Sequence, residues 1–294
     1  MQEQYIKLSD LYKVKGIGEK TIDRIKKTLL QEKNNTYISE YDEDIKLDVN
    51  KIHHGDCLEL MNGIEDKSID MVLCDLPYGT TACKWDTVIP FEPLWKQYER
   101  IIKDNGAILL FAQTPFDKVL GCSNIKNLRY EWIWEKEQGT GNLNANKMPL
   151  KKTENILVFY KKLPTYNPQM TEGSAYTIKR NYNDNEIFGK TGTKDGYVTK
   201  NTGIRYPTNL IKFNRELHDR LHPTQKPVAL FEYLIKTYTQ PGEIVLDNCI
   251  GSGTTAIAAL NTGRFFIGIE KEPKYVEIAR QRVKQAKMQE NLFV

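Results

Sequence analysis

The sequence predicts an α/β fold built on a doubly wound, mainly parallel sheet with helices on both faces. Between residues 51 and 290, short apolar runs of strand length alternate with longer segments of helical periodicity. Two of these runs, residues 69–74 and 243–247, lead into an acid and a tight turn. Ligands bind at the carboxyl ends of strands in such sheets, so we expect functional residues at these two strand ends.

The composition is that of an ordinary globular protein. The chain has 294 residues, 40% hydrophobic and 27% charged, with a net charge of +4. No apolar run approaches the length of a membrane span, and the charged first thirty residues are unlike a signal peptide, so we expect a cytoplasmic protein with no membrane segment. The five cysteines form no Cys-x-x-Cys pair and the four histidines lack zinc spacing, so we expect neither a disulfide framework nor a metal site.

Residues 1–34 are predicted to form a separate, small helical unit. Gly16 and Gly18 separate a short helix from a second helix expected over residues 19–31, which carries Lys20 in its first turn. The segment resembles a helix-hairpin-helix DNA-binding motif, in which backbone amides at a helix start meet a phosphate. The alternative is a helical hairpin used only for packing. An acidic linker is expected over residues 35–50.

The main domain, residues 51–294, is expected to begin with a β-α-β unit. A short strand from residue 51 ends at the acid Asp56, a helix covers residues 57–62, and residues 69–74 form a buried strand. Asp75-Leu76-Pro77-Tyr78 closes that strand, because Pro77 cannot continue it. Taken alone, these four residues fit an ordinary strand-to-loop turn equally well.

The middle of the chain predicts further strands. A helix is expected over residues 91–103, ended by Asn105-Gly106. Strands should follow over residues 107–111, 130–134 and 155–160. Residues 136–149 are rich in glycine and asparagine and are expected to form a mobile loop.

Residues 163–215 interrupt this regular pattern. They mix basic side chains with tyrosines and have no long apolar periodicity, so we expect a long functional or disordered loop. Residues 145–226 hold 15 lysines and arginines against 7 acids. A local basic excess of this kind favours contact with a phosphate backbone, although a solvated lysine-rich face is the commoner explanation for such an excess taken alone.

The last part of the chain predicts a second ligand-binding turn. A helix over residues 228–238 is followed by a strand ending at Asp247, the turn Gly251-Ser252-Gly253 and a helix beginning near Thr254. A strand over residues 265–270 and a helix over residues 273–289 complete the domain. Glycines at such a turn let a ligand lie against bare backbone. The glycine spacing also fits a relaxed dinucleotide fingerprint, so a nicotinamide enzyme is the competing interpretation of this stretch.

Two stretches together resemble the β group of amino-group DNA methyltransferases. Asp75-Leu76-Pro77-Tyr78 is similar to that family's Asp-Pro-Pro-Tyr signature, with leucine where the family usually has proline. Residues 246–255 are similar to its S-adenosylmethionine motif, and the order of the two motifs is that of the permuted group. The resemblance covers roughly residues 50–290. It implies a circularly permuted, Rossmann-like methyltransferase fold with a catalytic half (51–160), a target-recognition insert (163–215) and a cofactor half (220–290).

The resemblance also implies roles for individual residues. The catalytic set is Asp75, Leu76, Pro77 and Tyr78. The set expected to bind S-adenosylmethionine is Asp56, Asp75, Thr224, Lys226, Asp247, Gly251, Ser252, Gly253, Thr254 and Glu270. Together with the basic composition, it suggests DNA contacts by Gly16, Gly18, Lys20, Lys84, Lys147, Lys151, Lys179, Arg180 and Arg205.

The expected reaction is transfer of a methyl group to N6 of an adenine flipped out of double-stranded DNA. Aspartate at the first motif position is more typical of adenine enzymes in this family, whereas serine is typical of enzymes that act on cytosine N4. Cytosine N4 stays open because the chemistry is so similar, and RNA is a weaker alternative substrate. The non-enzyme alternative is a DNA-binding protein with a vestigial methyltransferase fold. A restriction-modification setting and a homodimer are expected by analogy alone.

Overall fold

The computed structural model describes residues 46–81, 83, 86–180, 183–185, 189–191, 197–215 and 225–290. The predicted unit over residues 1–34 and residues 35–45 of the acidic linker lie outside these residues. The division of the chain into domains therefore stays a prediction.

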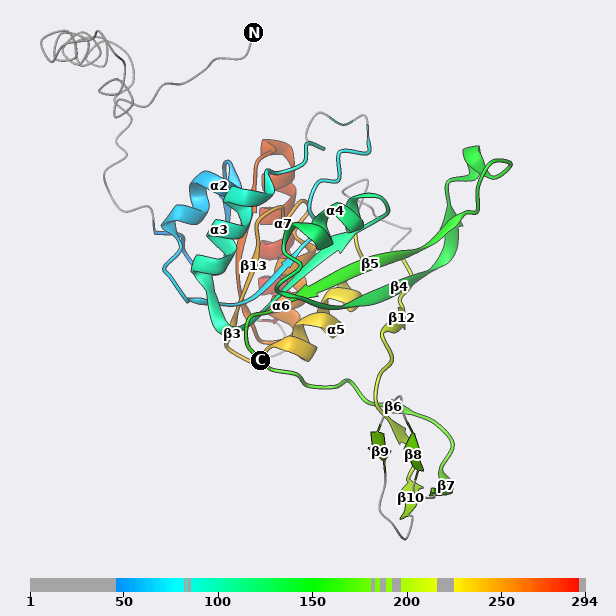
Figure 1. Ribbon diagram of the computed structural model, residues 1–294. Helices are drawn as coiled ribbons and strands as arrows, with labels where there is room; N and C mark the ends of the chain where they lie inside the picture. The colour runs from blue at the N-terminus through cyan, green and yellow to red at the C-terminus, as the bar shows by residue number, and fades with distance from the viewer. Residues whose placement is uncertain are drawn as a thin grey trace, which may run out of the picture. The chain divides into compact units, whose positions relative to one another are not determined.

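An eight-stranded sheet forms the centre of the described part of the chain (Figure 1). Its order is β1-β14-β13-β2-β3-β5-β4-β12. The first five of these strands are parallel to one another, β5 runs antiparallel to both β3 and β4, and β12 is parallel to β4. The predicted mainly parallel sheet is confirmed. The strands are β1 (Lys51–His54), β2 (Ile69–Cys74), β3 (Ile102–Ala112), β4 (Leu128–Thr140), β5 (Lys151–Phe159), β12 (Leu210–Lys212), β13 (Ile244–Asp247) and β14 (Phe265–Glu270).

Helices cover both faces of the sheet, so the doubly wound arrangement is also confirmed (Figure 1). One apolar core packs against the sheet from α5 (Val228–Tyr238), α6 (Thr254–Asn261) and α7 (Pro273–Glu290). A second core fills the opposite face under a different set of helices. These are α2 (Cys57–Leu60) with the 3-10 turn η2 (Met61–Gly63), α3 (Phe91–Ile101) and α4 (Phe116–Ser123).

Strand β2 lies between β13 and β3, and all six of its residues are buried. Its one charged residue, Asp70, is neutralised locally. Lys103 Nζ lies 2.5 Å from one Asp70 carboxylate oxygen, and the Ile244 backbone N–H donates to the other at 3.0 Å. Burial of an acid in mid-strand is therefore compensated, and the strand runs unbroken to Asp75.

The predicted helix over residues 91–103 is too long, and Asn105-Gly106 does not end it. The helix α3 stops at Ile101, and β3 begins at Ile102 because that residue pairs with Ile69 of β2. A Cβ on Gly106 would lie 2.7 Å from the Ile102 side chain and 2.8 Å from the Asp70 carbonyl oxygen. Gly106 is thus needed for close approach of two strands and not for a helix cap.

Both predicted long loops contain strands. Residues 136–149 form the outer part of a hairpin, since β4 continues to Thr140, the 3-10 turn η3 (Asn142–Asn144) follows and β5 starts at Lys151. The region 163–215 holds three antiparallel pairs of short strands, and β12 joins the main sheet. Exposed two-stranded hairpins bury no face, so they leave no apolar periodicity in the sequence. The short strands are β6 (Thr171–Glu172), β7 (Tyr176–Arg180), β8 (Asn183–Asn185), β9 (Gly189–Thr191), β10 (Tyr197–Asn201) and β11 (Ile204–Arg205).

Among the described residues, no helix combines the length and the apolar character that crossing a bilayer requires.

Candidate active site

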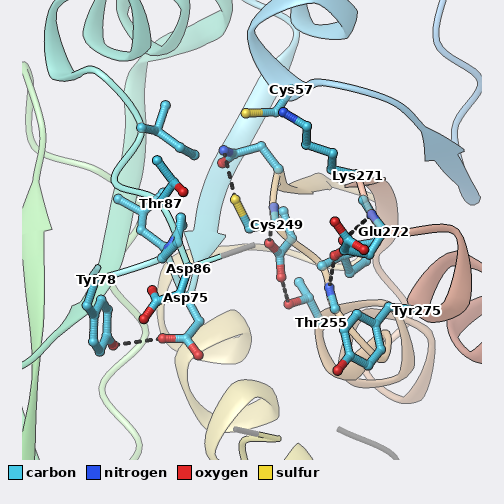
Figure 2. A pocket seen from close by; sticks show the side chains of 18 of the residues that line it. Cys57, Asp75, Tyr78, Asp86, Thr87, Cys249, Thr255, Lys271, Glu272 and Tyr275 are labelled. Atoms are coloured by element: carbon cyan, nitrogen blue, oxygen red, sulfur yellow. Dashed lines mark hydrogen bonds between the residues drawn. The ribbon is translucent and has the colours of Figure 1, made fainter. Parts of the chain in front are cut away.

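A cavity of about 360 Å³ opens where β1, β2, β13 and β14 reach their carboxyl ends. Figure 2 shows Asp75 and Tyr78 at one side of it and Lys271, Glu272 and Tyr275 at the other. The structure brings most of the predicted site residues together here. Those that line the cavity are Asp56, Asp75, Leu76, Pro77, Tyr78, Lys226, Asp247, Gly251, Ser252, Thr254 and Glu270. Thr224 lies outside the described residues.

Two glycines shape the turn after β13, but in different ways. Gly251 has φ +52° and lines the cavity. Gly253, with φ +89°, precedes the first residue of α6 and is not among the lining residues. A Cβ on Gly253 would lie 3.1–3.2 Å from the Cβ and Cα of Ala279 in α7. Gly253 therefore permits the packing of α7 against the turn. It was predicted to contact the cofactor, but it does not line the cavity.

Asp247 braces the same turn from inside. Its carboxylate accepts hydrogen bonds from the Cys249 backbone N–H at 3.0 Å and from the Thr255 hydroxyl. The side chain is 3% exposed. Burial raises the pKa of Asp247 to about 7, against the opposing effect of these hydrogen bonds.

Two further acids stand at neighbouring strand ends. Glu270 accepts the backbone N–H groups of Gly251 and Glu272, each at 2.8 Å, and burial raises its pKa. Asp56 caps α2 by accepting the Leu58 N–H at 2.9 Å and lies 3.1 Å from Lys271 Nζ. Both acids therefore have structural partners and still face the cavity.

The Asp75 carboxylate is held at both oxygens. Lys226 Nζ lies 2.5 Å from Oδ2, and the Tyr78 hydroxyl donates to Oδ1 at 2.7 Å. Lys226 was predicted to contact cofactor, but the structure places its ammonium against Asp75 and a second acid, Glu154, at 3.0 Å. Burial raises the pKa of Asp75, and the Lys226 charge opposes that shift.

Glu154 was not predicted from the sequence. It begins the buried part of β5 and is 4% exposed. One of its oxygens lies 3.1 Å from the Tyr78 hydroxyl oxygen, and the other lies 2.7 Å from Lys136 Nζ on β4. The two lysines outweigh burial and lower the pKa of Glu154, and the carboxylates raise the pKa of Lys226. The sequence signal that could have pointed to Glu154 is its position as an acid at the start of an apolar run.

The sequence model of the family described as DNA methylase matches residues 69–281, well over half of the chain. The chain belongs to the DNA methylase family. It is 31% identical over 262 residues to the type II methyltransferase M.BglII of Bacillus subtilis, covering 80% of this chain and 69% of that protein. It is 30% identical over 256 residues to M1.MboII of Moraxella bovis, covering 79% of this chain and 96% of that one.

Solved structures of similar proteins share the fold of this DNA methylase. The complex of M1.HpyAVI with SAM matches at a TM-score of 0.53 and 25% identity, covering 79% of this chain and 98% of the other. The cytosine-N4-specific PvuII DNA methyltransferase matches at a TM-score of 0.56 and 16% identity, with coverages of 82% and 92%. The second likeness concerns the fold alone.

The loop that follows residues 75–78 of this DNA methylase is ordered by one acid. The Asp86 carboxylate accepts the backbone N–H groups of Gly79, Thr80 and Thr81 at 2.7–2.9 Å. These hydrogen bonds lower the pKa of Asp86 although burial opposes them. The Tyr78 ring stacks on Phe116 with centroids 5.0 Å apart, so one ring face already has an aromatic partner.

The predicted DNA contacts of this DNA methylase are spread along the chain. Lys147 and Lys151 are exposed on the β4–β5 hairpin, and Lys179 is exposed on β7. Arg205 instead donates to the Ser174 carbonyl at 2.6 Å and packs over the Tyr176 ring, which gives it a structural role in the insert. Arg180 ends β7, and nothing further is described of its side chain. Gly16, Gly18, Lys20 and Lys84 lie outside the described residues.

Acidic, cysteine and histidine side chains do not gather into a metal site in the part of the chain that the structure describes.

Proposed function

We propose that this DNA methylase transfers a methyl group from S-adenosylmethionine to the exocyclic N6 amine of an adenine flipped out of double-stranded DNA. One observation carries the proposal. The acid, backbone carbonyl and ring of residues 75–78 end β2 in the same cavity as the glycine turn that ends the neighbouring strand, β13. Membership of the family and the aspartate at the first motif position support it.

The residues around the cavity fit the proposed cofactor. S-adenosylmethionine carries a sulfonium, an amino group and ribose hydroxyls, all of which suit carboxylate partners. Each carboxylate has about four acceptor positions, so the turn contacts of Asp247 and Glu270 leave acceptor capacity for such groups. Asp56 supplies a third acid, and Gly251 offers bare backbone. When bound there, the cofactor supplies an electrophilic methyl group.

The chain's own part in the reaction is to position the base. An exocyclic amine is a poor nucleophile because its lone pair is delocalised into the ring. The Asp75 carboxylate and the Leu76 backbone carbonyl would accept its two N–H bonds and localise that lone pair for in-line attack. Because the second acceptor is a backbone oxygen, leucine can stand where relatives of this group usually have proline.

Flipping the base out of the duplex costs roughly a few kcal/mol. Stacking on an aromatic side chain returns roughly 1–3 kcal/mol per base, which is the proposed role of the Tyr78 ring. Pro77 would fix the loop that presents both groups. Neither a covalent enzyme intermediate nor a metal ion is required by this scheme.

The test of the reaction is methylation of plasmid DNA by the purified chain with S-adenosylmethionine, followed by mass spectrometry of the nucleosides. We expect N6-methyladenine. N4-methylcytosine would keep the mechanism and reverse the base assignment. Absence of any methylated nucleoside, together with no cofactor binding in calorimetry, would overturn the proposal.

The test of the catalytic assignment is Asp75→Ala. The variant should bind S-adenosylmethionine and lose methylation by at least about a hundredfold, because positioning of the amine is lost. Substantial residual turnover would contradict the role given to Asp75. Gln138→Ala, on the exposed hairpin and outside the cavity lining, serves as a matched control for purification and folding.

We also propose how the protein meets DNA. Lys147, Lys151 and Lys179 are exposed and would contact the phosphate backbone, while the insert of residues 163–215 would read the sequence. Because the relatives named above are type II methyltransferases, we place the chain in a restriction-modification setting.

A further inference from the structure

We propose that Glu154 is a positioning residue that orients Asp75 and sets its strength as a hydrogen-bond acceptor, acting through Lys226 and Tyr78. This role rests on the proposed function. It concerns a residue that touches neither substrate nor cofactor in the scheme above.

Four groups form a closed ring. Glu154 Oε1 lies 3.1 Å from the Tyr78 hydroxyl oxygen, whose single proton it shares with Asp75, and 3.0 Å from Lys226 Nζ. The same hydroxyl donates to Asp75 Oδ1 at 2.7 Å, and the same ammonium lies 2.5 Å from Asp75 Oδ2. Both oxygens of the catalytic carboxylate are therefore held by groups that Glu154 holds in turn.

Glu154 is itself fixed from two other strands. Lys136 Nζ of β4 lies 2.7 Å from Oε2, and the Gln113 side-chain amide, just after β3, donates to Oε2 at 3.3 Å. Glu154, Lys136 and Lys226 are each at most 8% exposed. A buried carboxylate with four partners has little freedom to rotate, so its position defines that of the ring.

The charges of the ring explain why a second acid is present. With Glu154 in place, Lys226 divides its positive charge between two carboxylates, and Lys136 balances the second. Without Glu154, Lys226 would pair with Asp75 alone. A fully neutralised Asp75 would accept the substrate amine more weakly, and Tyr78 would lose its second acceptor.

The titration of Asp75 follows from its surroundings. Burial and the negative charge of Glu154 raise its pKa, whereas Lys226 and the Tyr78 hydroxyl lower it. The neighbouring acid Asp247 on β13 also feels the Asp75 charge. Removing the Glu154 charge should therefore lower the pKa of Asp75 and leave the other influences in place.

The test is Glu154→Gln in the full chain, with methylation of DNA measured at saturating S-adenosylmethionine across a range of pH. We expect kcat to fall roughly ten- to hundredfold, because the acceptor is misplaced, while the KM for S-adenosylmethionine changes little. The acid limb of the kcat profile should move to lower pH. Wild-type kcat and an unmoved acid limb in this variant would overturn the proposal.

Two further variants separate positioning from folding. Glu154→Gln combined with Lys136→Met restores charge balance, so it should recover thermal stability but keep the low kcat and the displaced limb. Full recovery of kcat by this double variant would show that Glu154 only balances charge and would overturn the role. Glu135→Gln is the matched control, since Glu135 on β4 pairs with the exposed Lys152 at 2.7 Å and should keep wild-type kinetics.

Failure of this inference is distinguishable from failure of the proposed function. A wild-type chain that methylates no nucleoside overturns both. An active wild-type chain whose Glu154→Gln variant is unaffected overturns the positioning role alone.

Discussion

Replacing Lys226 with methionine should strongly destabilise the fold. Lys226 is 8% exposed, and its ammonium lies 2.5 Å from Asp75 and 3.0 Å from Glu154. Its removal leaves the half-buried Asp75 carboxylate without the cation that contacts it, while the buried Glu154 carboxylate keeps Lys136 as its partner. Removing one partner of a buried ion pair costs about 3–5 kcal/mol of unfolding free energy.

The expected change in melting temperature follows from this cost. A domain of this size loses about 2–4 °C in Tm for each kcal/mol, so Lys226→Met should melt about 6–20 °C below wild type. The loss should depend on pH. With its cation gone, the already raised pKa of Asp75 should rise further. An acid whose pKa is raised by folding stabilises the fold below its unfolded pKa, and that stability is lost as pH rises through the folded value.

The assay is calorimetric or fluorescence melting of wild type and variant at about pH 5.5 and about pH 8. The deficit in Tm should be larger at the higher pH. Lys226→Met combined with Asp75→Asn removes the uncompensated Asp75 charge, leaves the Lys136–Glu154 pair in place and should recover part of the loss. A variant that melts within about 2 °C of wild type at both pH values would refute the reasoning, since water would then have to solvate Asp75 and Glu154.

Three other predictions test separate parts of the structure. Gly253→Ala should cost more unfolding free energy than Gly263→Ala. Both positions have positive φ, but only at Gly253 would the added Cβ contact neighbouring atoms, those of Ala279. Equal losses in denaturant titrations would contradict this. Asp247→Asn should flatten the fall in stability of the cofactor-free protein as pH rises from the ordinary aspartate pKa to about 7, because burial raises the pKa of Asp247 to about 7 and its protonated form is favoured by folding. An unchanged pH dependence of unfolding would contradict it. Replacing Lys147 and Lys151 together with alanine should weaken DNA binding and reduce the slope of log affinity against log salt by roughly 2, and an unchanged slope would show that neither contacts phosphate.

The parts of the fold that the sequence predicts well are those encoded by contiguous residues. Residues 69–74 are apolar except at Asp70, with Pro77 shortly beyond, and they form the strand with the predicted bounds. Residues 228–238 likewise form the predicted helix. The turn at residues 251–253 and the motif at residues 75–78 were each visible locally, and the parallel sheet brings them into one cavity.

The residues that sequence reasoning missed depend on partners from other strands. Glu154 and Lys136 each look like an ordinary charged residue in the sequence, and their contact becomes visible only when β4 and β5 pair beside β3. Asn105-Gly106 resembles the usual end of a helix. The structure instead requires glycine at position 106 because the backbone of Asp70 lies too close for a side chain. Local patterns carry no information on such contacts.

The balance of charge around Asp75 bears on which solution conditions affect DNA binding and which affect turnover. The charges of two carboxylates, Asp75 and Glu154, cancel those of two ammonium groups, Lys136 and Lys226, so this cluster attracts a polyanion only weakly at long range. Capture of DNA must then depend on exposed cations, which salt screens, whereas buried pairs are screened far less. Ionic strength should therefore act on the encounter with DNA and pH on the turnover of the bound complex, which gives two nearly independent means of studying one reaction.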